Sequence, residues 1–150
     1  MQKQQTLDHA LRATWQAVAK MYNEQAVKHD STMAMAFVLL TIDIENGTPS
    51  TSLGPLMGME PTSLSRILKS MEEKGAIYRE KNPEDGRGVL IKLTEFGIEK
   101  RNISKEHVIL FNETAKSQLS ETQIKHFFEV TEAINKLIIE KSIFETITTK

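Results

Sequence analysis

Apolar residues recur at three- and four-residue steps along most of this chain, the spacing that gathers them on one face of an α-helix. The first such stripe predicts a helix from about Thr6 to His29. The second, from about Thr32 to Glu45, is apolar on several faces, so we expect it to be deeply buried. Gly47 and Pro49 follow and should end this helix, because glycine suits a left-handed C-cap and proline blocks resumption.

Two shorter helical segments come next. One is predicted over Ser52 to Met57, where a proline is tolerable in the first turn. The other, from Pro61 to Lys74, places an apolar stripe opposite a polar face. Pro61 suits a first helical position, and Gly75 suits the C-cap.

A hairpin is predicted between these helices and the C-terminal third of the chain. Ala76 to Lys81 is the first strand, and Val89 to Leu93 is the second, with alternate apolar residues on one face. The polar segment between them, NPEDGRG, is rich in turn formers and predicts a long tip.

The remaining sequence predicts two long helices. Thr94 caps the first, which should reach about Lys116. A capping-box pattern from Ser120 to Gln123 begins the second, which should reach about Lys141. Three helices followed by a hairpin are the arrangement of a winged helix-turn-helix, so the fold class is mainly α (α+β), with additional flanking helices.

The absence of cysteine changes the list of functions open to the chain. It excludes disulfides, thiol catalysis, thiol redox sensing and thiolate metal sites. The N-terminal segment lacks the apolar stretch of a secretory signal, and no apolar run is long enough to cross a bilayer. We therefore expect a cytoplasmic protein with no membrane partner.

The formal net charge of −1 argues against indiscriminate nucleic-acid binding by the whole surface. From Glu60 to Lys92, seven lysine and arginine residues face six acids, which leaves only +1. This balance does not exclude DNA binding, because the position of the basic residues matters more than their total.

A helix-turn-helix places the first residues of its second helix in the major groove. The outer face of the Pro61–Lys74 helix carries small hydroxyl residues, which can approach DNA closely, followed by two cations. The candidate DNA contacts on this helix are Pro61, Thr62, Ser63, Ser65, Arg66 and Lys69. The two cations are alternatively the solvent face of an amphipathic helix; we favour DNA contact, whereas the serines stay evenly balanced between the two roles.

The hairpin tip adds Arg87 and Asp85 to the candidate DNA-binding residues. An arginine at this place suits a narrow minor groove, where the negative potential is enhanced. Asp85 would orient its guanidinium group or hold the loop by a local ion pair. The alternative is a solvated loop-tip charge, which would be preferred if Arg87 stood alone.

The segments SLSRILKSMEEKGAIYR (63–79) and PEDGRGVLIKLTEFG (83–97) resemble the recognition helix and wing of the MarR family of bacterial transcription regulators. The layout of flanking helices agrees, so the resemblance spans nearly the whole chain. It implies one domain over residues 1–150, with a winged helix-turn-helix at 32–94 and dimerisation helices at 1–30 and 95–150. It further implies a homodimer, double-stranded DNA with a pseudo-palindromic operator as partner, and a small aromatic effector.

Other ligands and chemistries find little support. Trp15, Tyr22 and Phe37 are candidates for an effector pocket, although core packing is the preferred interpretation of aromatic residues at helical spacing. The four histidines are scattered, so no metal is expected, and no cofactor motif or catalytic motif is present. The chain is therefore not expected to be an enzyme.

The leading hypothesis is a ligand-responsive, homodimeric repressor that binds specific DNA sequences. The alternative is a helical, dimeric protein-interaction module that keeps the fold without DNA binding, because a fold does not fix a function. Binding of duplex DNA at rising salt separates the two, since phosphate contacts make affinity fall steeply with salt concentration.

Overall fold

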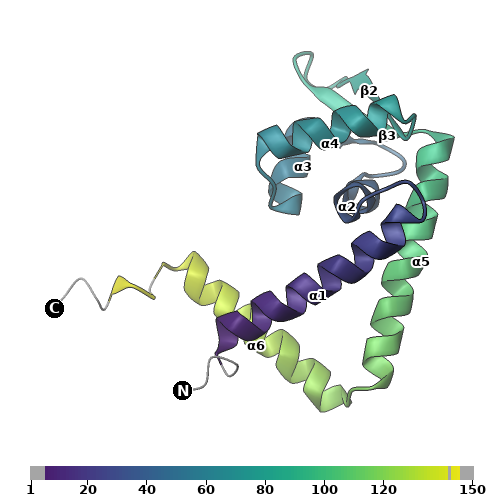
Figure 1. Cartoon of the computed structure of the whole chain (residues 1–150). Helices are drawn as coiled ribbons and strands as arrows, with labels where there is room; N and C mark the ends of the chain where they lie inside the picture. The colour runs from purple at the N-terminus through teal and green to yellow at the C-terminus, as the bar shows by residue number, and fades with distance from the viewer. Residues whose placement is uncertain (1–5, 142, 146–150) are drawn as a thin grey trace. The chain divides into compact units, whose positions relative to one another are not determined.

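A computed structural model describes residues 6–141 and 143–145 of the chain. It divides into two compact units, Met1–Val108 and Ile109–Lys150, which are described separately below. Figure 1 shows the order of the elements along the chain. The helices are α1 (Leu7–Val27), α2 (Met33–Thr41), α3 (Ser50–Met57), α4 (Pro61–Glu73), α5 (Glu95–Ser117) and α6 (Glu121–Ile139).

The predicted class is confirmed: the described part is mostly helical, with a small antiparallel sheet in the order β1-β3-β2. Strands β2 (Ile77–Lys81) and β3 (Val89–Leu93) form the predicted hairpin, in which Ile77 pairs with Leu93 and Lys81 with Val89.

The predicted end of α2 is wrong, because the helix stops at Thr41 rather than near Glu45. Ile42 is already extended (φ −69°, ψ 131°). The Asp43 carboxylate accepts hydrogen bonds from the backbone N–H groups of Glu45 (2.9 Å) and Asn46 (3.0 Å). Such local side-chain bonds compete with the helical ladder and turn the chain.

Strand β1 (Thr48–Pro49) is the element that the sequence pattern did not predict. Thr48 pairs with Ile91, and Pro49 pairs with Leu90. The buried Thr48 hydroxyl also accepts a hydrogen bond from the Asp43 backbone N–H (2.9 Å). Two residues are too few to show alternation, and the edge of the sheet is where a proline is tolerated.

A single apolar core joins the sheet to α2, α3 and α4. Leu64, Leu68 and Met71 bury one face of α4, so the opposite face of this helix is turned to solvent. The remaining buried members are Val38, Leu39, Ile42, Leu53, Ala76, Ile77, Ile91 and Leu93. The prediction of a deeply buried α2 is correct for Val38 and Leu39, whereas Ile44 lies beyond the helix and is 48% exposed.

The start of α5 is fixed tightly against the turn that follows α4. The Thr94 hydroxyl accepts a hydrogen bond from the Gly97 N–H (3.0 Å), which confirms the predicted cap, and donates one to the Gly75 carbonyl (2.5 Å). The Thr94 N–H donates to the Ala76 carbonyl (3.1 Å). Gly97 has no side chain to separate α5 from Ala76, so the backbone of α5 lies directly against that of the winged helix-turn-helix (the winged lobe, residues 32–94).

The second unit contains the end of α5 and α6. Ser120 and Gln123 form the predicted capping box at the start of α6. None of the residues of α6 is buried, and Phe127, Phe128 and Leu137 are among its exposed apolar side chains. None of the helices in the described part of the chain has the length and apolar character needed to cross a bilayer.

Candidate nucleic-acid interface

The start of α4 presents backbone and hydroxyl donors to solvent. Pro61 occupies the first turn, and Glu60 at the N-cap makes no side-chain hydrogen bond to the first amides. Amides at a helix N-terminus favour a phosphate, both by hydrogen bonding and through the helix dipole. Pro61, Thr62, Ser63 and Ser65 are all exposed. The predicted outer face of this helix therefore exists.

Two cations continue this exposed face along α4. Arg66 and Lys69 are exposed and lie one turn apart, whereas Leu64 and Leu68 point into the core. Among the described residues, neither cation takes part in an ion pair. Both are therefore available to an anionic partner.

The hairpin tip is ordered by bonds to its own backbone. The Asp85 carboxylate accepts a hydrogen bond from the Arg87 backbone N–H (3.0 Å), and the Asp85 carbonyl accepts one from Gly88 N–H (2.9 Å). Asp85 thus shapes the loop through the backbone of Arg87, and no ion pair with its guanidinium is found in the described chain. Arg87 is exposed, and Figure 1 shows the β2–β3 loop projecting from the sheet.

Acidic residues beside the candidate interface are partly neutralised by their own cations. Glu72 pairs with Arg79 (2.8 Å), and Glu80 pairs with Lys92 (2.9 Å). The hydrogen bond from Lys92 to Glu80 raises the pKa of this lysine. An arginine at the base of the wing could contact a phosphate or form an ion pair, and the structure shows the ion pair for Arg79. Glu72 and Glu80 therefore pair with cations other than Arg66 and Lys69, the two exposed cations of α4.

The aromatic candidates for an effector site separate in the structure. Tyr22 and Phe37 meet edge to face, with ring centroids 6.1 Å apart, and line a cavity of about 30 Å³ with His29, Lys100 and His107. Burial raises the pKa of Tyr22. Trp15 is 53% exposed on α1 and does not line this cavity, so it belongs neither to the core of the single chain nor to this site.

A neighbouring cavity of about 290 Å³ brings together two lysines that the sequence pattern did not place near each other. Its lining combines apolar side chains, among them Met35, Met71 and Phe96, with the side chains of Lys74 and Lys100. These lysines are 26 residues apart in the sequence, and no local pattern predicts that they meet. In the described part of the chain, no group of three or more histidines, aspartates or glutamates could hold a metal ion.

Comparison with known proteins finds similar transcription regulators. The sequence model of the MarR family matches residues 32–89. The HTH-type transcriptional regulator SarZ of Staphylococcus haemolyticus is 35% identical over 88 residues, which cover 59% of this chain and 60% of SarZ. The match therefore spans less than two thirds of that relative's length.

Solved structures share the fold at lower identity. The MepR–DNA complex of S. aureus has a TM-score of 0.80 at 21% identity and covers 88% of this chain and 98% of MepR. CouR of Rhodococcus jostii bound to p-coumaroyl-CoA has a TM-score of 0.77 at 21% identity, covering 87% of this chain and 92% of CouR. At these identities the likeness establishes the winged-helix fold.

Proposed function

We propose that this chain is a member of the MarR family and a homodimeric transcription regulator that binds specific sequences of double-stranded DNA; the match of residues 32–89 to the model of that family supports the assignment. The observation that carries this proposal is the exposed outer face of α4. There the hydroxyls of Thr62, Ser63 and Ser65 precede the unpaired cations Arg66 and Lys69. A helix of this kind enters the major groove with its N-terminal residues on the base edges.

Each candidate residue has a role in this proposal. The first-turn amides after Pro61 and the hydroxyls of α4 bind phosphates and fix the register of the protein on the duplex. Arg66 reads a guanine edge in the major groove, and Lys69 contacts a phosphate. Arg87 enters the adjacent minor groove, and Asp85 keeps the tip in shape through the backbone bond described above.

The proposal of a homodimer rests on apolar side chains that are exposed to solvent in the single chain. Leu7, Leu11 and Trp15 are exposed on α1. In the second unit, the exposed apolar side chains include Ile109, Leu110, Phe127, Phe128, Leu137, Ile138 and Ile139. Apolar surface of this kind marks an interaction site. A two-fold dimer would present two recognition helices about 34–36 Å apart, the spacing of successive major grooves on one face of DNA.

The effector proposed here is a small aromatic molecule. Its support is the pair of cavities beside Tyr22, Phe37 and Phe96, together with the p-coumaroyl-CoA that CouR binds in its solved structure. An effector that binds one dimer geometry better than another shifts the population away from the DNA-binding spacing, limited by its differential affinity. Because the chain contains no cysteine, this response does not involve a thiol.

The proposal places the protein in the cytoplasm, as a repressor without an enzymatic activity. The near-neutral lobe favours one competing function, a dimeric protein-interaction module without DNA affinity. The regulator and the interaction module differ in how their affinity for duplex DNA depends on salt. Each phosphate contact adds about 0.9 to the steepness with which log K falls against log salt concentration.

Selection of bound duplexes from a random pool tests the proposal. We expect a pseudo-palindromic sequence whose half-sites lie about 10 base pairs apart, with affinity that falls steeply with salt. Failure to enrich any sequence, together with no measurable binding to mixed duplex DNA at low salt, would refute DNA binding and favour the interaction module.

A further inference from the structure

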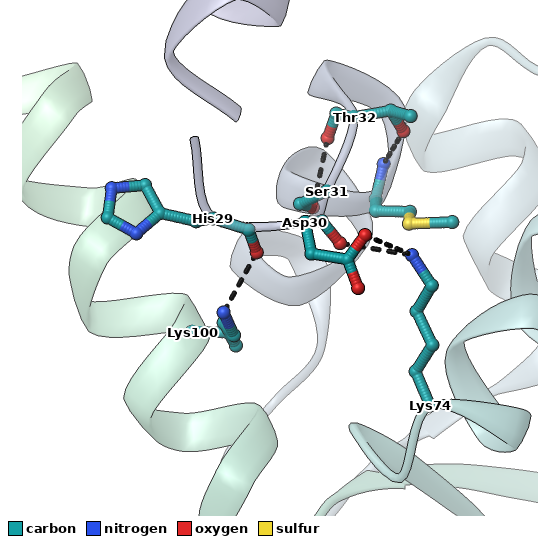
Figure 2. A network of polar contacts seen from close by, with 7 residues as sticks. His29, Asp30, Ser31, Thr32, Lys74 and Lys100 are labelled. Atoms are coloured by element: carbon teal, nitrogen blue, oxygen red, sulfur yellow. Dashed lines mark hydrogen bonds and ion pairs between the residues drawn. The ribbon is translucent and has the colours of Figure 1, made fainter. Parts of the chain in front are cut away.

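Two lysines from different helices converge on the loop that joins α1 to α2. The Lys100 ammonium, from α5, donates a hydrogen bond to the His29 carbonyl (2.8 Å). The Lys74 ammonium, at the C-cap of α4, donates to the Asp30 carbonyl (3.0 Å) and lies 3.6 Å from the Asp30 carboxylate. Figure 2 shows the Lys100 ammonium beside His29 and the Lys74 ammonium beside Asp30.

The loop has a conformation that needs support. Asp30 adopts a positive φ of 52°, which L-residues other than glycine rarely occupy. The Asp30 side chain is 91% exposed, so the ion pair alone contributes little stability. The two bonds to successive backbone carbonyls instead fix where the loop lies relative to α4 and α5. Lys100 is additionally held over the Phe96 ring, 5.3 Å from its centroid.

We propose that Lys74 and Lys100 are positioning residues that clamp the α1–α2 loop and thereby set the orientation of the winged lobe on α1 and on the first part of α5. The lobe joins these helices at two places along the chain. One is the compact Thr94–Gly97 junction, and the other is this loop. Releasing the loop removes one of these two restraints and leaves side-chain contacts such as that of Tyr22 with Phe37 to hold the lobe against α1.

The expected consequence for DNA binding rests on the function proposed above. Helix α4 has 13 residues and is therefore about 20 Å long. A tilt of about 10° around its C-terminal end would displace the residues at its start by about 3 Å, as much as a whole hydrogen-bond length. A small loss of restraint at Lys74 is thus enlarged at the start of α4, where the residues proposed to fix the register on DNA lie.

The first test measures operator affinity of the full-length dimer across a range of salt concentrations. Lys74→Met and Lys100→Met should each weaken binding about three- to tenfold with an unchanged salt slope, whereas Lys74→Arg, which keeps the donor, should restore most of it. Lys105→Met is the matched control: it removes the same charge from an exposed site on α5 and should change affinity less than about twofold.

Asp30→Asn separates positioning from a direct phosphate contact by Lys74. Asparagine tolerates a positive φ, and the substitution removes an acid next to the lysine. A lysine that contacts phosphate would be released, and binding would tighten; the clamp predicts equal or weaker binding. Tightening, or a salt slope about 0.9 smaller in Lys74→Met, would overturn the proposal.

A second test needs no DNA, so it separates failure of the clamp from failure of the proposed function. Because the chain has no cysteine, Thr51→Cys on α3 and Glu106→Cys on α5 accept spin labels only at these exposed sites. Labelled protein is diluted with unlabelled protein so that distances within one chain dominate. The distance distribution should broaden or shift in Lys74→Met and Lys100→Met; an unchanged distribution contradicts the clamp even if no operator is ever found.

Discussion

Replacing Gly97 by alanine tests how tightly α5 is joined to the lobe. A Cβ atom at this position would lie 2.0 Å from the Ala76 carbonyl oxygen and 3.0 Å from its carbon. Ordinary carbon–oxygen contacts begin at about 3.3 Å, so the two backbones would have to separate by more than about 1 Å. That movement strains the hydrogen bonds from Thr94 to Gly75 and Ala76.

The free energy of unfolding should fall by about 2–4 kcal/mol. Overpacking of this kind costs about 1–3 kcal/mol, and each weakened hydrogen bond costs about 0.5–1.5 kcal/mol. The gain of about 1 kcal/mol from alanine in a helix offsets part of this loss. For a chain of this size, the melting temperature should fall by roughly 5–15 °C.

Thermal and urea unfolding, followed by circular dichroism at one protein concentration, compare the stability of Gly97→Ala with that of the wild type. Two other glycines form a graded control. At Gly54 the new Cβ would lie 3.1 Å from the Met59 carbonyl oxygen, so a smaller loss is expected; at Gly86 the nearest atom is 3.8 Å away, so stability should hardly change. A Gly97→Ala protein as stable as the wild type would refute the close approach of the two segments.

Three further substitutions examine the interface, the α2–β1 turn and the dimer. Arg87→Ala should weaken operator binding by about 1–3 kcal/mol, measured by fluorescence anisotropy, without changing the melting temperature; wild-type affinity would remove the wing from the interface. Hydrogen bonds from the backbone of Asn46 and Glu45 lower the pKa of Asp43 below 3.8, so their stabilisation is present above that pH and is lost as the pH falls through the lowered pKa. Asp43→Ala should therefore destabilise the protein at pH 7 but not in strong acid, in urea titrations at both pH values; an equal loss at both would contradict this account. Phe128→Asp, on the exposed face of α6, should shift the protein to monomer in sedimentation equilibrium, and an unchanged dimer would exclude Phe128 from its interface.

Local signals made much of the fold predictable from the sequence. The caps at Thr94 and Ser120 and the left-handed Gly75 depend on residues within three or four positions, and the structure has all three. The apolar stripe of α4 was sufficient to identify its exposed face, because Leu64 and Leu68 could only point inward. The position of this face was set by the stripe, and its interpretation as a DNA-binding face came from the helix-turn-helix arrangement.

The features that were missed depend on contacts between distant residues. Strand β1 exists because Thr48 pairs with Ile91, 43 positions away. The clamp on the α1–α2 loop joins Lys74 to Asp30 and Lys100 to His29, and neither pair has a spacing that a periodic pattern could reveal. The end of α2 was placed too late because the apolar run continues to Ile44, although the chain has already turned at Ile42.

Tethered DNA cleavage tests most directly whether the start of α4 and the wing tip form one DNA-binding surface. The cysteine-free chain permits an iron chelate to be attached at Ser65→Cys in one protein and at Gly86→Cys in another, both at exposed positions. On a selected operator we expect Ser65→Cys to cleave around the major groove of each half-site and Gly86→Cys around the adjacent minor groove, about half a helical turn away. Cleavage from only one of the two positions, or from neither, would contradict a continuous interface.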